Sequence, residues 1–401
     1  MIARKNWLKF SLLPTLLLAL VAPPHAIAAP KAITVKTLTK WSDAVGIELI
    51  SSTTKALITV KNVIGTSADV EVQARDFSGT TLWSKTIDSG LDEVATAIAS
   101  DSQGNIWIAG NSAQAIPVDT STVTAPALNP DSVVIETQAP LRSDMRLLTL
   151  WKLNSLGEIV EKFTLTQSDI SLVDAISVSA TGISILASRE DGAFVISANL
   201  KGVFGKELKI GTTKTKLSAI VRSSDGTINL FGSSTETLGG KKLVGREDGV
   251  LIKISKTGAL ASVVRSSSPK GYRIWNSATS ALFLAGSVRT GSVTESAITK
   301  FTNTYAPTWT MRIASTGPAL AANGPSNWFY AALEPTSAIK GLNNFKVAKG
   351  QSLILQFDSK GVITNAFTAA DLTQIKALTY STDGGLFAMT ESAIFKVGAT
   401  K

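Results

Sequence analysis

Apolar and polar residues alternate along most of this chain in short runs of about four to eight residues. Val, Ile, Leu, Thr and Trp fill these runs, and Gly, Asn, Asp or Ser separate them. Alternation with a period of two is typical of strands that bury one face, and the separating residues are those of tight turns. The sequence therefore predicts antiparallel β-hairpins from about residue 32 onward, with almost no helix.

Two kinds of hairpin sequence, called here the first and the second phrase, alternate along the chain. The first is represented by "TAIASDSQGNIWIAGNS" (96–112), whose second strand is expected to end near its Gly-Ser, and the second by "VQARDFSGTTLWSKTI" (72–87). One phrase of each kind makes a four-stranded antiparallel unit. The glycine in the turn of the second phrase marks the repeat, at Gly79, Gly157, Gly202, Gly258 and Gly361. Four-stranded units that recur every ~40–50 residues are typical of a β-propeller.

The ends of the chain allow the units to be counted. Six full units are expected to start near residues 43, 92, 174, 217, 271 and 318. The C-terminal residues 376–398 supply three further strands, and residues 32–40 supply one strand ahead of the first unit. We therefore predict an all-β, seven-bladed β-propeller of four-stranded antiparallel blades, with the last blade closed by the N-terminal strand. Two stacked sandwiches and a parallel β-helix are the alternatives.

The first 28 residues have the pattern of a secretory signal peptide. Arg4, Lys5 and Lys9 precede a leucine-rich run, and the small residues "AIA" (26–28) follow it. A membrane anchor is the alternative, but the run is shorter than the ~20 residues that a spanning helix needs. We expect a signal peptide over 1–28, a single propeller domain over 29–401, no membrane span after cleavage, and a secreted, extracellular or cell-envelope location.

Composition restricts the chemistry. The one histidine, His25, lies in the expected signal peptide, and the chain has no cysteine. Catalytic triads, His-bearing zinc sites and disulfides are thereby excluded from the mature chain. Carboxylate pairs, Lys, Tyr, a Ser-Lys pair and oxygen-ligated metals stay open. The net charge of +9 comes from scattered basic residues, densest in "GGKKLVGR" (239–246), so no nucleic-acid partner is expected.

One unit resembles a known repeat. The stretch "GTTLWSKTIDSGLDEVATAIASDSQGNIWIAGNS" (79–112) is similar to the β-propeller repeat of bacterial secreted proteins, with its Gly-x-x-x-Trp strand and Asp-x-x-Gly-Asn turn. The resemblance implies a secreted propeller that serves surface display, adhesion or cell-envelope work. It does not imply an enzyme, because such repeats serve as scaffolds of varied use. The stretch also resembles a sialidase Asp-box, but Ser102 stands where that motif has Asp, and no motif supplies the arginine cluster of a sialidase.

Carboxylates recur near predicted strand starts. In a propeller, the connections that lead into first and third strands open on one face, so these acids are expected to lie on a shared face. Such acids could bind Ca²⁺ or a cationic or sugar ligand, or each could simply cap its own turn. The metal is left open, and no cofactor and no catalytic residue is assigned. The candidate ligand-binding residues are Asp43, Asp92, Asp144, Asp174, Asp191 and Asp248.

Long connections on the same predicted face offer a binding surface, namely residues 113–144, 235–248 and 333–350. The recurring tryptophans, such as Trp83 and Trp309, are expected to pack between blades rather than to hold sugars. The sequence favours an exported, non-enzymatic, monomeric binding or scaffold module whose partner is a cell-surface glycan or protein. The alternative is a hydrolase or lyase that acts on extracellular polysaccharide through carboxylates of this face.

Overall fold

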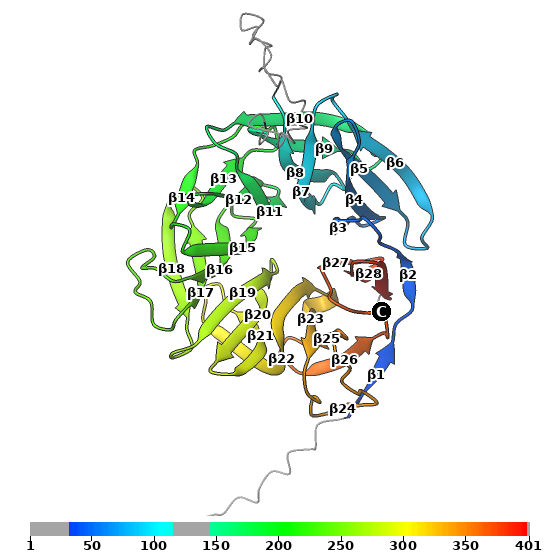
Figure 1. Ribbon diagram of the computed structural model, residues 1–401, viewed down its shortest axis with the longest axis vertical. Helices are drawn as coiled ribbons and strands as arrows, with labels where there is room; N and C mark the ends of the chain where they lie inside the picture. The colour runs from blue at the N-terminus through cyan, green and yellow to red at the C-terminus, as the bar shows by residue number, and fades with distance from the viewer. Residues whose placement is uncertain (1–31, 115–144, 399–401) are drawn as a thin grey trace, which may run out of the picture.

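The computed structural model describes residues 32–114 and 145–398, and strands dominate both segments. They radiate as sheets around a ring, with β3, β7, β11, β15, β19 and β27 nearest its centre (Figure 1). One single-turn 3₁₀ segment, Pro325–Asn327, is the sole helical element of the described residues. The prediction of an all-β propeller with four-stranded antiparallel blades is confirmed.

Five of the sheets in the described part of the chain have four strands each. The first two consist of β3 Leu49–Ser52, β4 Leu57–Ile64, β5 Ala68–Arg75 and β6 Thr81–Ile87, and of β7 Glu93–Ser100, β8 Ile106–Ser112, β9 Leu147–Leu153 and β10 Ile159–Thr166. The next two consist of β11 Leu172–Ser179, β12 Gly182–Arg189, β13 Gly192–Ala198 and β14 Leu208–Ile210, and of β15 Thr215–Arg222, β16 Ile228–Ser234, β17 Asp248–Ile254 and β18 Leu260–Ser266. The fifth consists of β27 Ala377–Ser381, β28 Gly385–Met389, β29 Ala393–Val397 and β2 Lys40–Asp43.

The predicted count of seven four-stranded blades is wrong, because a nine-stranded sheet joins the remaining strands of the described residues. The nine-stranded sheet forms because β22 Pro307–Asn323 runs for 17 residues without a break and pairs first with β21 and then with β23. Gly317, with φ of +120°, lies where the register of the β22–β23 pairing shifts, between Ser315 and Ala319. The other strands of this sheet are β19 Tyr272–Ala278, β20 Phe283–Thr290, β21 Val293–Phe301, β23 Phe329–Pro335, β25 Leu353–Phe357, β26 Ile363–Thr368, β1 Ile33–Thr37 and β24 Leu342–Asn343.

The N-terminal strand also differs from the expectation. The segment 32–40 was expected to complete the last blade, but β1 within it pairs in parallel with β26 of the nine-stranded sheet. The strand that completes the last sheet is β2, which pairs antiparallel with β29. Residues 33–43 therefore contribute one strand to each of two neighbouring sheets.

The middle strands carry the core. Every residue of β8 and of β16 is buried, so these strands are covered on both faces by the neighbouring sheets. The glycine near the end of the first hairpin phrase does not end the strand, since β8 continues through Gly110 to Ser112. The Asp101 carboxylate caps the preceding turn by accepting from the Gln103 and Asn105 backbone N–H groups, each at 2.9 Å.

Trp83 packs between two neighbouring sheets, as expected, whereas Trp309 packs between two parts of the nine-stranded sheet. The Trp83 indole N–H donates to the Ser155 carbonyl at 3.0 Å, and the Trp309 indole N–H donates to the Ser359 carbonyl at 3.1 Å. In both cases the ring covers the turn glycine of the next unit, Gly157 or Gly361, so closely that a Cβ atom there would lie 2.5 Å from ring carbon. In these two units, the turn glycine of the second hairpin phrase therefore leaves the space that the tryptophan ring occupies.

Candidate functional site

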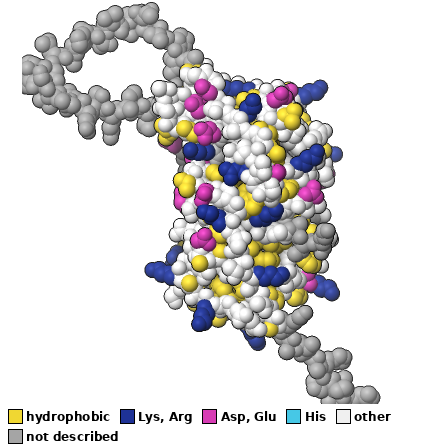
Figure 2. All heavy atoms as spheres, turned by 90° about the vertical axis from the view of Figure 1, so that its right-hand side faces the viewer, with side chains coloured by type: hydrophobic (Ala, Val, Ile, Leu, Met, Phe, Trp, Pro, Cys, Tyr) yellow, Lys and Arg dark blue, Asp and Glu magenta, His cyan; other side chains and the backbone are white. Residues whose placement is uncertain are grey.

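The predicted binding face is defined by the connections between second and third strands and between neighbouring sheets, which antiparallel pairing places at one end of the strands. We call it the upper face; it includes residues 65–67, 88–92, 167–171, 190–191, 235–247 and 267–271. The lower face carries the turns between the first two and the last two strands, such as residues 53–56, 154–158 and 255–259. On the side of the molecule in Figure 2, Lys, Arg, Asp and Glu are interspersed.

Two of the candidate acids have partners of their own, and a third lies outside the described residues. Asp43 ends β2 on the rim and pairs with Lys40 at 2.6 Å, and the hydrogen bond from Lys40 lowers the pKa of the Asp43 carboxyl. Asp92 is buried, and its carboxylate accepts from the Ala68 N–H at 2.8 Å across two sheets. Asp144 falls in the segment 115–144, outside the described residues.

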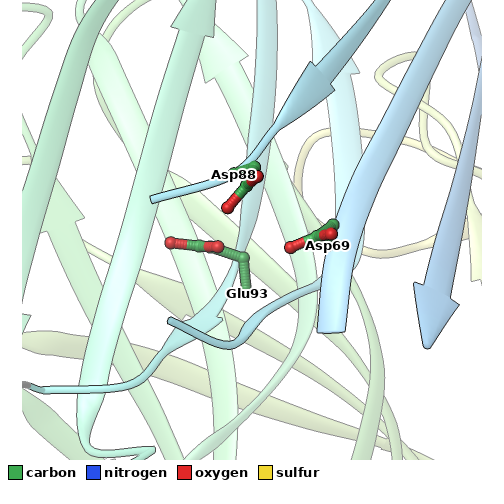
Figure 3. Close-up of side chains that lie close together, drawn as sticks. All are labelled: Asp69, Asp88 and Glu93. Carbon is green, nitrogen blue, oxygen red and sulfur yellow. The ribbon is translucent and has the colours of Figure 1, made fainter. Parts of the chain in front are cut away.

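An acidic cluster that the sequence analysis missed lies next to Asp92. Asp69, Asp88 and Glu93 each place a carboxylate oxygen within 4.8 Å of the others. Figure 3 shows the three side chains turned toward one another, from β5, from the connection after β6 and from β7. The dense acidic run "DSGLDE" (88–93) was the signal in the sequence for this cluster, but only its Asp92 was chosen as a candidate ligand-binding residue.

The three carboxylates of this cluster could serve as cation ligands, but one of them already has a cationic partner. Carboxylate oxygens are ligands that suit Ca²⁺, which takes six to eight of them in proteins. Glu93, however, is fully buried and already lies 3.6 Å from the Lys162 ammonium, and it accepts a short hydrogen bond from the Ser89 hydroxyl. A divalent cation would therefore compete with Lys162 for Glu93, the acid of the cluster that forms an ion pair between β7 and β10.

Asp174 lies on β11, the strand of its sheet that is nearest the centre of the ring (Figure 1). It accepts from the Ser188 hydroxyl at 3.3 Å. Although the residue is exposed, the surrounding protein partly desolvates its carboxylate, and this desolvation raises the pKa of Asp174. Among the described residues, the Ser188 hydroxyl is the one hydrogen-bond donor to the Asp174 side chain, and no basic side chain pairs with it.

This raised pKa makes a testable prediction. A carboxyl that binds its proton more tightly when folded contributes stability at low pH, and that contribution is lost as pH rises through the folded pKa. Asp174→Asn should therefore gain stability relative to the wild type between about pH 3 and pH 7. Urea unfolding across that range measures the difference. A carboxyl NMR titration of Asp174 with a midpoint at or below the ordinary aspartate value would contradict it.

The last two candidates, Asp191 and Asp248, occupy matching "REDG" phrases but different environments. Asp191 lies in the exposed turn between β12 and β13 and binds the Lys209 ammonium at 2.6 Å, which lowers the pKa of the Asp191 carboxyl. Asp248 begins β17, is fully buried, and pairs with Arg265 at 3.2 Å. None of the five described candidates bonds to another, so the structure gives each a separate set of partners.

Asp191 borders a recess of the upper face with a volume of about 740 Å³. The loop between β10 and β11 forms one wall, and the end of β12, the following turn and Glu207 form the other. Its lining residues are Arg146, Ser168, Asp169, Ile170, Arg189, Glu190, Asp191, Phe194 and Glu207. The sequence analysis had placed the binding surface on this face but had named only Asp191 of this set.

Three charged groups of this recess, Arg189, Glu207 and Asp191, are held in ion pairs. The Arg189 guanidinium pairs with the Glu207 carboxylate and donates to the Gln167 side chain. It also stacks on the Phe194 ring, 4.2 Å from the ring centroid, while Lys209 lies 5.6 Å from the same centroid. Stacking and ion pairing together restrict the arginine to one orientation, which lowers the entropy cost of contacting a ligand.

Comparison with known proteins identifies the class of fold. The WD40 domain of Toxoplasma gondii coronin aligns with a TM-score of 0.51 and 10% identity, over 93% of this chain and 89% of that chain. BBS1N, solved in complex with ARL6DN, gives 0.48 and 10% over 92% and 99% of the two chains, and the Dos1 propeller gives 0.48 and 9% over 91% and 95%. At these identities the coronin similarity establishes a β-propeller fold and nothing about activity.

No family model matches this sequence, and comparison with curated proteins gives no match. Within residues 32–114 and 145–398, no helix has the length and hydrophobicity that crossing a membrane requires.

Proposed function

We propose that this protein is an exported β-propeller that binds its ligand at the upper face without chemically changing it, as a binding or scaffold module of the cell exterior. The export part rests on the signal-like residues 1–28. The binding part rests on one observation, the 740 Å³ recess in which Arg189, Glu207 and Asp191 are held in ion pairs. Its volume falls in the ~300–1,000 Å³ range of small-ligand sites.

The pairing favours recognition over acid catalysis. Cleavage of a glycosidic bond by the common route needs one carboxyl that stays protonated, with a raised pKa, beside a second carboxylate. In the recess, Lys209 lowers the pKa of the Asp191 carboxyl, and Arg189 holds the Glu207 carboxylate as an ion pair. The Asp191 carboxyl is stabilised as an anion, and both carboxylates are held in place, which suits fixed hydrogen-bond acceptors for sugar hydroxyls or peptide N–H groups.

The test uses the full chain, expressed with its N-terminal 28 residues. The exported protein should begin after Ala28 or Ala29, and it should bind members of a printed array of cell-wall glycans without releasing product from the same glycans in solution. Ser168→Trp should reduce binding, because exposed Ser168 lines the recess and the added indole fills it. Release of reducing or unsaturated sugar ends would instead support the hydrolase or lyase alternative.

Thr54→Trp is the matched control, because Thr54 is an exposed residue of a lower-face turn. It should leave glycan binding unchanged. Equal loss of binding in both variants would place the binding surface away from the recess and contradict this part of the proposal.

A further inference from the structure

A second recess on the upper face, about 340 Å³ in volume, lies where β19, β20 and the middle of β22 meet. We propose that it binds an oxyanion group of an acidic polysaccharide, with Arg246 and Arg289 as the anion-binding residues and Tyr272 as their platform. This inference rests on the proposed binding function and names the class of ligand. It reverses the expectation that the acids of this face make the binding contacts.

Tyr272 holds the two arginines in place. It begins β19 and pairs with Arg289 of β20, whose guanidinium lies 4.2 Å from the centroid of the tyrosine ring. Arg246 comes from the end of the 235–247 connection, its guanidinium lies 6.0 Å from the same centroid, and its Nη1 contacts the Tyr272 hydroxyl at 3.5 Å. A stacked guanidinium keeps its N–H edges free, and these edges match the two oxygens of a carboxylate, sulfate or phosphate group.

Both arginines lack a carboxylate partner among the described residues, and both are exposed. Arg189, Arg265 and Arg312 each have one, at Glu207, Asp248 and Glu295. The acid in the lining of the recess is Glu247, which accepts from the Ser233 hydroxyl at 2.6 Å. Within the lining, Arg289 balances the charge of Glu247. Arg246 is not part of the lining but lies beside it, against Tyr272, and adds a second positive charge at this edge of the recess.

The remaining lining suits a sugar. The Ile274 and Pro318 side chains offer apolar surface to the C–H face of a sugar ring, and the Ser287, Thr294 and Thr316 side chains offer hydroxyls to its hydroxyl groups. A nucleic-acid site would instead need a longer basic stripe with several aromatic rings. Hydroxyls, apolar faces and a positive edge together favour a uronate or a sulfated sugar.

The probes are alginate, a polymer of uronic acids, heparin, a sulfated polymer, and neutral dextran, with the full exported chain at low ionic strength. We expect alginate or heparin to bind and dextran not to bind. Arg246→Gln and Arg289→Gln should each weaken binding by about tenfold or more, the cost of one charge-assisted hydrogen-bond pair. Tyr272→Phe should have a smaller effect, because it keeps the aromatic ring beside both arginines and removes only the hydroxyl that contacts Arg246.

Lys201→Gln and Lys360→Gln remove the same charge from exposed positions in lower-face turns and serve as controls. Unchanged unfolding midpoints confirm that all variants are folded. Lowering the pH below about 4 should abolish alginate binding and spare heparin binding, since only the carboxylate titrates there, and this separates the two oxyanions.

Three results would overturn the site: unchanged affinity in the arginine variants, equal weakening by the arginine and the control lysine variants, or tighter binding of single-stranded poly-dT than of either polysaccharide. Failure of the site is distinct from failure of the proposed function. Polysaccharide cleavage with arginine-dependent binding would contradict only the binding-module proposal. Unchanged affinity in the arginine variants, without cleavage, would contradict only this site.

Discussion

Asp248→Asn is expected to lower the free energy of unfolding by about 3–5 kcal/mol, the range measured when one partner of a buried ion pair is removed. The Asp248 side chain is fully buried, and the side chain of its partner Arg265 is only 5% exposed. The neutral amide would leave the arginine charge in the interior without a counter-charge. Burial of an unpaired charge is among the few causes of single-residue effects this large.

The pair also fixes the long 235–247 connection. The Asp248 carboxylate accepts from the Val244 and Gly245 N–H groups, both at 2.9 Å. Arg265 donates from Nε to the Lys241 carbonyl at 3.1 Å and from Nη2 to the Glu236 carbonyl. Loss of the carboxylate should therefore loosen this connection first, and amide hydrogen exchange at Val244 and Gly245 should accelerate more than exchange in β16.

Asp191→Asn is the matched control, since Asp191 holds the same place in the other "REDG" phrase. Its ion pair with Lys209 is exposed, with side chains 60% and 45% accessible. Solvent screens such a pair, so urea unfolding should detect little change in this variant. Similar losses for the two variants would show that the Arg265 pair does not carry the stability of this region.

The fold could be predicted from the sequence in part. Alternation and turn residues were enough to predict the hairpins and the propeller, because period-two patterning and turn chemistry are local properties. The blade count failed at β22, where nothing in "MRIASTGPALAAN" (311–323) shows that one strand will pair with β21 and then with β23. Continuity across two sheets depends on contacts far apart in the chain.

The site was predicted less well, for a related reason. Whether an acid is exposed, as Asp191 is, or buried against an arginine, as Asp248 is, depends on a partner 18 or 17 residues away. The Arg246–Tyr272–Arg289 arrangement joins three separate segments, and the basic run 239–246 gave no sign of it because Tyr272 and Arg289 lie well beyond that run. The upper face itself followed from connectivity alone.

Gly110→Ala and Gly232→Ala should each destabilise the protein by about 1–3 kcal/mol or more, the cost of overpacking a close contact. A Cβ atom on Gly110 would lie 1.9 Å from the Val94 carbonyl oxygen, and one on Gly232 would lie 2.1 Å from the Lys216 carbonyl oxygen. Neither glycine has a positive φ, so the restriction is space and not backbone conformation.

The close approach arises from a β-bulge that recurs in the first hairpin of the repeat. The register between β7 and β8 shifts between Ala95 and Ala97, directly opposite Gly110, and the register between β15 and β16 shifts between Leu217 and Ala219, opposite Gly232. The bulge pushes the backbone of the inner strand toward its neighbour, where only a residue without a side chain fits. The glycine of "IAGNS" (108–112) is thus explained by strand pairing.

Gly65→Ala is the control, because a Cβ atom there would have its nearest neighbour at 3.7 Å and the residue has no positive φ. Urea unfolding should give a near-wild-type midpoint for this variant and clearly lower midpoints for the two bulge variants. Because each bulge lies at the inner strand, its distortion should also reach the upper-face connections that this strand supports. Wild-type stability for Gly110→Ala would mean that the β7–β8 bulge can relax, and would contradict the steric explanation of the repeated glycine.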